Sequence, residues 1–75
     1  MGNYLVTIND KEYTVEAEEL PFISILIMAG LKPTAKAEVT WVNLFRNHSG
    51  KLLAGNSLYL NTMKHVVVSV KEIYE

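Results

Sequence analysis

The sequence predicts an α+β fold in which one short apolar helix lies against a mixed sheet of four or five strands. Two observations predict it. The segment 20–31 is the only one with the marks of a helix, and the segments on both sides of it alternate apolar and polar residues with a period of two. The length of 75 residues, with 49% hydrophobic and 20% charged residues, is typical of one folded domain, here 1–75.

The helix is predicted from Pro21 to Ala29, because residues that start and stop helices stand at both ends. Pro21 suits the first turn of a helix, where its missing N–H group is not needed. Gly30 suits the left-handed position just after a helix, and Pro33 prevents continuation.

Apolar residues cover more of this helix than a single sheet can bury. Those at the spacing i, i+3, i+4, i+7 form an inner stripe, which consists of Phe22, Ile25, Leu26 and Ala29. Ile23 and Ile27 form a second apolar pair on the neighbouring face. This pair is either ordinary core or a surface for another protein, and we hypothesise a weak homodimer or a partner contact there.

The predicted strands, in chain order, are Tyr4–Ile8, Tyr13–Val15, Glu38–Asn43, a brief piece at Leu58–Leu60, and Lys64–Val70. Asn9 and Asp10 are expected to form the turn of a first hairpin. Residues 44–50 are predicted to be an exposed loop, and Trp41 is expected to be core or half-buried. The last strand is rich in β-branched residues and apolar enough to be central in the sheet.

The last strand also predicts the topology. If it pairs in parallel with the first strand, the helix supplies the crossover between them, and the arrangement is a β-grasp. Alternation then directs Val66, Val68 and Val70 toward the helix. His65 and Val67 fall on the open face of the sheet, opposite the helix. The residues expected to be buried are Val6, Ile8, Phe22, Leu26, Val66 and Val68.

Several function classes find no support in the composition. The net charge of −1 gives no long-range attraction for nucleic acid, and the longest apolar run is well short of the ~20 residues that span a membrane. Without cysteine, no disulfide or thiolate metal site can form, which suits a cytoplasmic protein. His48 and His65 lack further ligands at metal-binding spacing. No nucleophile–base pair or pair of acids can be assembled, so we expect neither an enzyme nor a cofactor.

Four stretches, taken in order, resemble a known family. They are residues 6–13, residues 25–33, residues 38–41 and the segment 52–70. This series resembles the bacterial ubiquitin-like proteins of the multiubiquitin type, which are β-grasp domains. The resemblance implies three partners: an adenylating activating enzyme, a conjugating enzyme and a JAB-type metallopeptidase. The segment 65–70 is also similar to ubiquitin's final strand, which implies that His65 and Val67 lie on a partner-binding face.

Two functions are compatible with the resemblance, and the composition of the C-terminal tail distinguishes between them. The first is a protein modifier or modifier-derived protein, which would react through a C-terminal carboxylate. The second is a non-covalent protein-interaction module. The tail contains Lys71, Glu72, Ile73, Tyr74 and Glu75, with no glycine after Gly55, so conjugation would need trimming or an activating enzyme suited to this end. We expect this tail to be mobile and to be the point of any processing or attachment.

Overall fold

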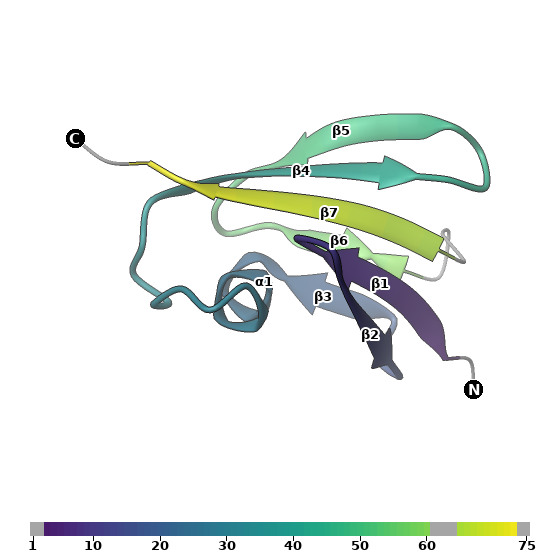
Figure 1. Cartoon of the computed structure of the whole chain (residues 1–75), viewed down its shortest axis with the longest axis horizontal. Coiled ribbons are helices and arrows are strands. Elements are labelled where there is room, and N and C mark those ends of the chain that lie inside the picture. Colours follow the sequence, from purple (N-terminus) through teal and green to yellow (C-terminus); the bar gives the residue numbers. More distant parts are fainter. Residues whose placement is uncertain (1–2, 61–64, 74–75) are drawn as a thin grey trace.

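The computed structural model describes residues 3–60 and 65–73, and in these it is a small α+β protein with one helix and a mixed five-stranded sheet (Figure 1). The elements are β1 (Tyr4–Ile8), β2 (Lys11–Val15), β3 (Glu19–Pro21), α1 (Phe22–Met28), β4 (Ala37–Asn43), β5 (His48–Leu52), β6 (Ser57–Tyr59) and β7 (His65–Glu72). The strand order in the main sheet is β2-β1-β7-β4-β5, and β3 pairs with β6 in a separate two-stranded sheet.

The last strand is central, as the sequence predicts. β7 pairs in parallel with β1 and antiparallel with β4, which places it between the two hairpins β1–β2 and β4–β5. Its alternate valines carry the core: Val66 and Val68 are fully buried, and each lies beside a buried residue of β1. A run of β-branched residues suits this position, because both neighbours of the strand are other strands.

The turn of the first hairpin also joins the hairpin to β7. Asn9 and Asp10 have φ values of 47° and 68°, which is the geometry of a tight two-residue hairpin turn. The side-chain amide of Asn9 donates a hydrogen bond to the carbonyl oxygen of Val70 at 3.1 Å. The Val70 N–H group donates to Oδ1 of the same asparagine at 2.9 Å. The asparagine side chain therefore continues the pairing of β7 beyond the end of β1.

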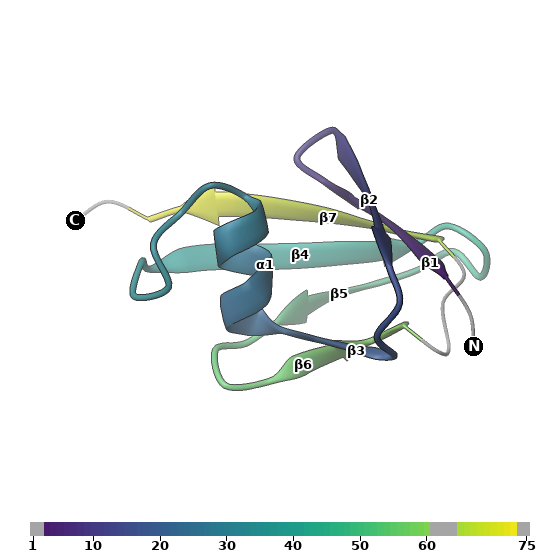
Figure 2. The ribbon, with the colours of Figure 1, turned by 90° about the horizontal axis from the view of Figure 1, so that it is seen from below.

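The helix lies across one face of the main sheet (Figure 2) and ends as the sequence predicts. Gly30 has a φ of +86°, and its N–H group bonds to the carbonyl oxygen of Ile27 at 3.0 Å. The N–H group of Leu31 bonds to the carbonyl oxygen of Leu26 at 2.9 Å, which completes a Schellman motif. At the other end, Pro21 is the N-cap rather than a residue of the first turn.

The core lies between α1, the small sheet and the helix-facing side of the main sheet. All six residues that were expected to be buried are buried, with exposures from 0% to 7%. Trp41 is half-buried, as expected, and lies over Gly50 of the neighbouring strand, which leaves no space for a Cβ atom at that glycine. The glycine therefore lets β5 pass beneath the indole ring.

One sequence prediction of local structure is wrong, and one strand was not predicted. The predicted loop 44–50 is a turn only as far as Asn47, and β5 begins at His48 and pairs with β4. Polar residues predominate there because β5 is an edge strand, so one of its sides faces solvent. The short strand β3 was missed, because three residues give too short a pattern to recognise and its pairing with β6 is distant in sequence.

Candidate protein-interaction surface

The main sheet leaves one face uncovered by the helix, and that face carries a group of partly apolar side chains. We call this group the open-face patch; it consists of Leu5, Thr7, Val42, His65 and Val67. The strand register aligns Thr7 with Val67 and Val67 with Val42, so these three lie side by side across β1, β7 and β4. Leu5 lies beside His65 in the next row. The sheet therefore brings residues from three strands together on the face that the sequence predicts for His65 and Val67.

The imidazole ring of His65 is held on this face by a neighbouring side chain. Its Nε2 atom lies 3.3 Å from Oγ1 of Thr7, in a hydrogen bond whose donor depends on the tautomer of the ring. The histidine and Val67 are half-buried, whereas Val42 is 36% exposed. This hydrogen-bonding ring lies among apolar side chains, so the patch combines apolar contacts with a polar group.

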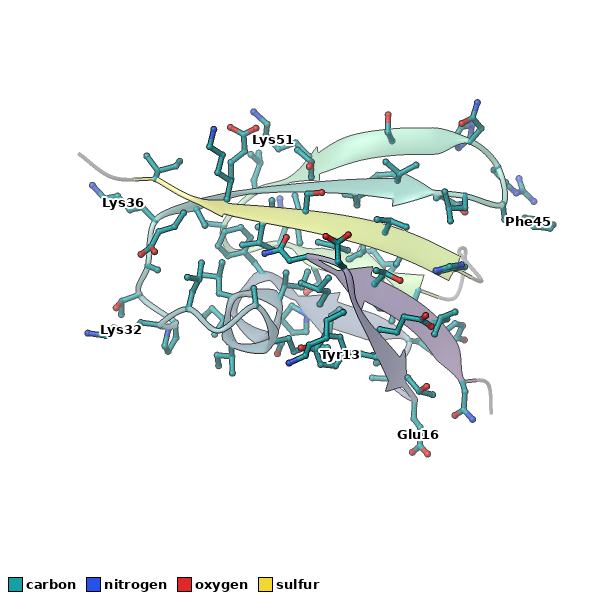
Figure 3. All side chains as sticks on the ribbon, in the orientation of Figure 1. Tyr13, Glu16, Lys32, Lys36, Phe45 and Lys51 are labelled. Atoms are coloured by element: carbon teal, nitrogen blue, oxygen red, sulfur yellow. The ribbon has the colours of Figure 1, made fainter. Side chains whose placement is uncertain are left out.

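The β4–β5 turn adds two exposed apolar residues that sequence reasoning did not assign to a site. Leu44 and Phe45 are 54% and 65% exposed, and Figure 3 shows Phe45 at the tip of this hairpin. The Leu44 N–H group lies 3.3 Å from the carbonyl oxygen of His65, which places this turn beside the open-face patch. The side chain of Asn43 braces the turn by accepting a hydrogen bond from the Phe45 N–H group at 3.1 Å. The sequence signal that could have revealed this site is the apolar pair Leu44 and Phe45 next to turn-forming residues.

The second apolar pair of the helix, which the sequence left as either core or surface, is exposed. Ile23 and Ile27 are 54% and 55% exposed, whereas Ile25 and Leu26 are completely buried. The pair lies on the helix side of the molecule, and the open-face patch lies on the other side of the sheet. The structure therefore does not unite the four predicted partner-binding residues in one site; it separates them into two surfaces.

The prediction of a mobile tail from Lys71 onward is wrong for its first three residues. Lys71 and Glu72 belong to β7 and pair with Glu38 and Ala37 of β4. The N–H group of Ile73 donates a hydrogen bond to the carbonyl oxygen of Lys36 at 2.8 Å. Lys71 suits this segment because it lies on the open face of the sheet, which is in contact with water, whereas Glu72 alternates to the other face and is half-buried. Tyr74 and Glu75, the rest of the predicted attachment point, lie outside the described residues.

The two histidines do not form a pair. His48 lies opposite Asn43, which lies opposite Val66, so the strand alternation places His48 and His65 on different faces of the sheet. Within residues 3–60 and 65–73, no group of three or more histidine, cysteine or acidic side chains is arranged to hold a metal ion.

Comparison with known proteins adds no assignment. No family model, curated protein or solved structure matches this chain. In the part of the chain that the structure describes, no helix meets the length and apolarity needed to cross a membrane, since α1 has only 7 residues. The geometry of the surfaces is therefore the basis of the functional proposal.

Proposed function

We propose that this chain is a β-grasp protein that binds other proteins non-covalently through the open-face patch. The observation that carries the proposal is the juxtaposition of Val42, Val67 and Leu5 on a sheet face that no helix covers within the described residues. Apolar side chains from three adjacent strands, with a histidine at the edge of the group, give a contact that excludes water at its centre and has a polar anchor. A cytoplasmic location suits such a module.

The fold assignment rests on topology. A β-grasp has a mixed sheet in which the first and last strands pair in parallel at the centre and a single helix packs on one face. The strand order β2-β1-β7-β4-β5, with β1 parallel to β7, supports that assignment. The ordered pairing of Lys71 and Glu72 favours non-covalent binding over attachment, because this segment is held in the sheet.

The test is binding by the partners that the ubiquitin-like resemblance implies, namely an adenylating activating enzyme and a JAB-type metallopeptidase. We expect Val67→Asp to abolish binding without unfolding the protein, because a carboxylate at the centre of the patch would be desolvated on docking. Ser69→Asp is the matched control, since Ser69 is exposed on the same strand and the same face. Calorimetric titration measures the affinity. Equal affinity of wild type and Val67→Asp would overturn the proposal.

A second candidate function is a protein modifier, and one observation favours it. β7 is the last described strand and runs to one end of the sheet (Figure 1), and Ile73, the last described residue, is 50% exposed, so an enzyme could reach this end of the described chain. The test is the intact mass after incubation with an activating enzyme of the ubiquitin type and ATP, before and after treatment with the metallopeptidase. Formation of a covalent adduct or a trimmed species would support the modifier. An unchanged mass would leave the non-covalent module.

A further inference from the structure

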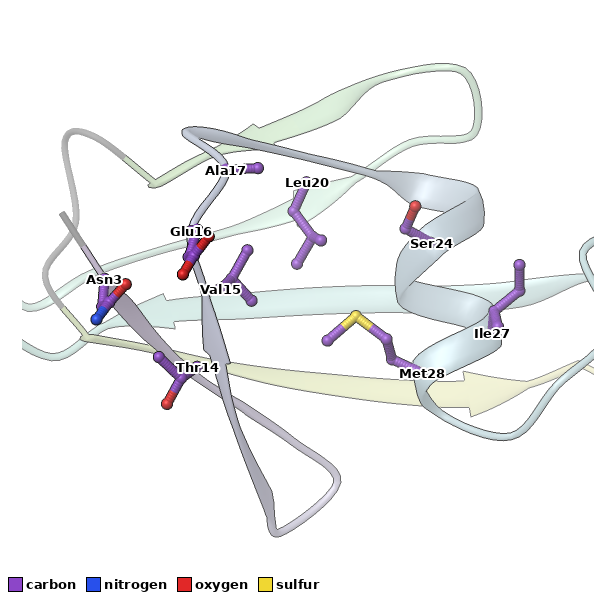
Figure 4. A pocket seen from close by; sticks show the side chains of 9 residues that line it. All are labelled: Asn3, Thr14, Val15, Glu16, Ala17, Leu20, Ser24, Ile27 and Met28. Carbon is purple, nitrogen blue, oxygen red and sulfur yellow. The ribbon is translucent and has the colours of Figure 1, made fainter. Parts of the chain in front are cut away.

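A groove separates the helix from the edge strand of the main sheet (Figure 4). Its volume is about 820 Å³, and it lies on the helix side of the molecule, away from the open-face patch. The apolar lining comes from Val15 on β2, Leu20 on β3, and Ile27 and Met28 on α1. Ser24 and the exposed Glu16 supply polar groups to the lining. One of the two exposed isoleucines of the helix is thus part of a concave surface.

The groove has a defined width because its two walls are joined. The hydroxyl group of Tyr13 on β2 donates a hydrogen bond of 2.8 Å to the carbonyl oxygen of Met28, at the last turn of the helix. This bond connects the edge strand to the end of α1 across the sheet–helix gap. A ligand would therefore meet a surface that is largely pre-formed.

One wall of the groove is a strand with an unpaired edge. Within the described residues, β2 pairs only with β1 and ends the strand order of the main sheet. Lys11 faces Ile8 across the two-residue turn, and Tyr13 faces Val6, so these positions bond inward to β1. By alternation, the backbone N–H and C=O groups of Glu12 and Thr14 point outward. A strand added there would direct every second side chain into the groove.

Glu16 lines the groove and belongs to an acidic segment of the chain, and this charge selects among occupants. Residues 10–19 contain five acidic residues and one lysine, a net charge of −4, in a chain whose net charge is −1, so the remaining residues carry +3. A second copy of this chain placed symmetrically on the groove would bring two such acidic segments together, which is unfavourable. A peptide with lysine or arginine beside its apolar residues is favoured by the same charges.

We infer that this groove binds an extended peptide segment of a partner protein, which adds to β2 as a further strand. The segment has apolar residues at alternate positions, which enter the groove, and basic residues on both sides of them, which are attracted by Glu16 and by the net negative charge of the segment 10–19. Backbone hydrogen bonds to Glu12 and Thr14 hold it along β2, and the apolar residues contact Val15 and Ile27. The site is independent of the open-face patch, which lies on the other side of the sheet.

The direct probe is the synthetic peptide Lys-Lys-Val-Thr-Val-Thr-Val-Lys-Lys, labelled for fluorescence anisotropy. We expect Ile27→Glu to weaken binding by roughly tenfold, because one apolar contact is lost and the new carboxylate would be desolvated against the valines of the peptide. Ile23→Glu is the matched control: Ile23 is equally exposed on the same helix but does not line the groove. Glu16→Lys should also weaken binding, whereas Glu38→Lys, on β4, should not. Val67→Asp should have no effect, which separates this site from the proposed function.

Strand addition makes a second, more specific prediction. Two versions of the peptide are compared, one N-methylated at the odd-numbered amides and one at the even-numbered amides. Only one of these two N-methylation phases should abolish binding, because the amides of an added strand alternately face β2 and solvent. Hydrogen exchange of the protein should slow at the Glu12 and Thr14 amides and remain unchanged at Tyr13, which already bonds to β1.

The following results would overturn the inference: no binding at about 1 mM peptide, equal binding of the same peptide with glutamate in place of lysine, or equal tolerance of both N-methylation phases. Unchanged affinity of Ile27→Glu would do so as well. If the protein instead forms a dimer that Ile27→Glu dissociates, the occupant is a second copy of the chain, and the peptide inference is wrong.

Discussion

The two isoleucine-containing sides of α1 have the same chemistry and opposite environments. Ile25 is completely buried against the sheet, whereas Ile23, two residues earlier, is 54% exposed. The same contrast holds across the main sheet, where Val66 and Val68 are buried and Val67 between them is half-buried on the open face. Hydrophobicity alone therefore does not separate core from surface in this protein. Core and surface residues differ in whether the side chain points into the layer between the helix and the sheet. The apolar side chains that point away from that layer are the candidates for binding.

The largest expected effect concerns the buried side of the helix. Leu26→Ala should lower the free energy of unfolding by about 2–5 kcal/mol, because Leu26 has no exposed surface and truncation leaves a cavity. Urea denaturation followed by the fluorescence of Trp41, the single tryptophan, measures the change. A loss below about 0.5 kcal/mol would show that this side of the helix is not the core.

A smaller effect is expected where the core meets the edge strand β5. Gly50→Val should cost about 1–3 kcal/mol, because a Cβ atom at this position would lie 2.7 Å from Cζ2 of Trp41 and force the indole ring to move. The same denaturation experiment measures it, with an altered emission maximum of the folded state as a second readout. Ser49→Val is the control, since the neighbouring residue is exposed. Equal stability of the two variants would contradict the close packing of the ring.

The turn between β1 and β2 allows a test of how much the side-chain hydrogen bonds of Asn9 contribute to the stability of the fold. Asn9→Gly retains the backbone freedom that a φ of 47° requires but removes two hydrogen bonds to Val70. We expect a loss of about 1–2 kcal/mol and faster hydrogen exchange at the Val70 amide. Asp10→Gly is the matched control, because Asp10 has a similar backbone conformation and its side chain has no such role. Similar losses in both variants would assign the effect to the turn conformation alone.

The smallest effect on stability is expected on the exposed side of the helix. The double variant Ile23→Glu with Ile27→Lys should change the free energy of unfolding by no more than about 0.5 kcal/mol, because both side chains are more than half exposed. If these residues form a weak homodimer, sedimentation should show a concentration-dependent dimer for wild type and a monomer for the variant. A wild type that stays monomeric, together with an unfolded variant, would place both isoleucines in the core.

The sequence by itself determined the parts of the fold that depend on local signals. Gly30 ends the helix because its left-handed conformation is costly for other residues, and the alternation of the segment 65–70 assigns its two faces. The α+β class, the central last strand and the six buried residues follow from these patterns. They also placed His65 and Val67 on the open face, but they left open whether Ile23 and Ile27 belong to the core or to the surface.

Only the tertiary structure decided which distant segments share a surface. The polar segment at His48 became a strand because β4 supplied hydrogen-bond partners, and Lys71 and Glu72 were held in β7 for the same reason. The groove beside β2 joins Val15, Leu20 and Ile27, which lie on three separate elements. Backbone pairing and the meeting of elements depend on contacts between residues far apart in the chain. Local periodicity contains no information about those contacts, so the groove and the meeting of Leu5, Val42 and Val67 on the open face became visible only when the chain was folded.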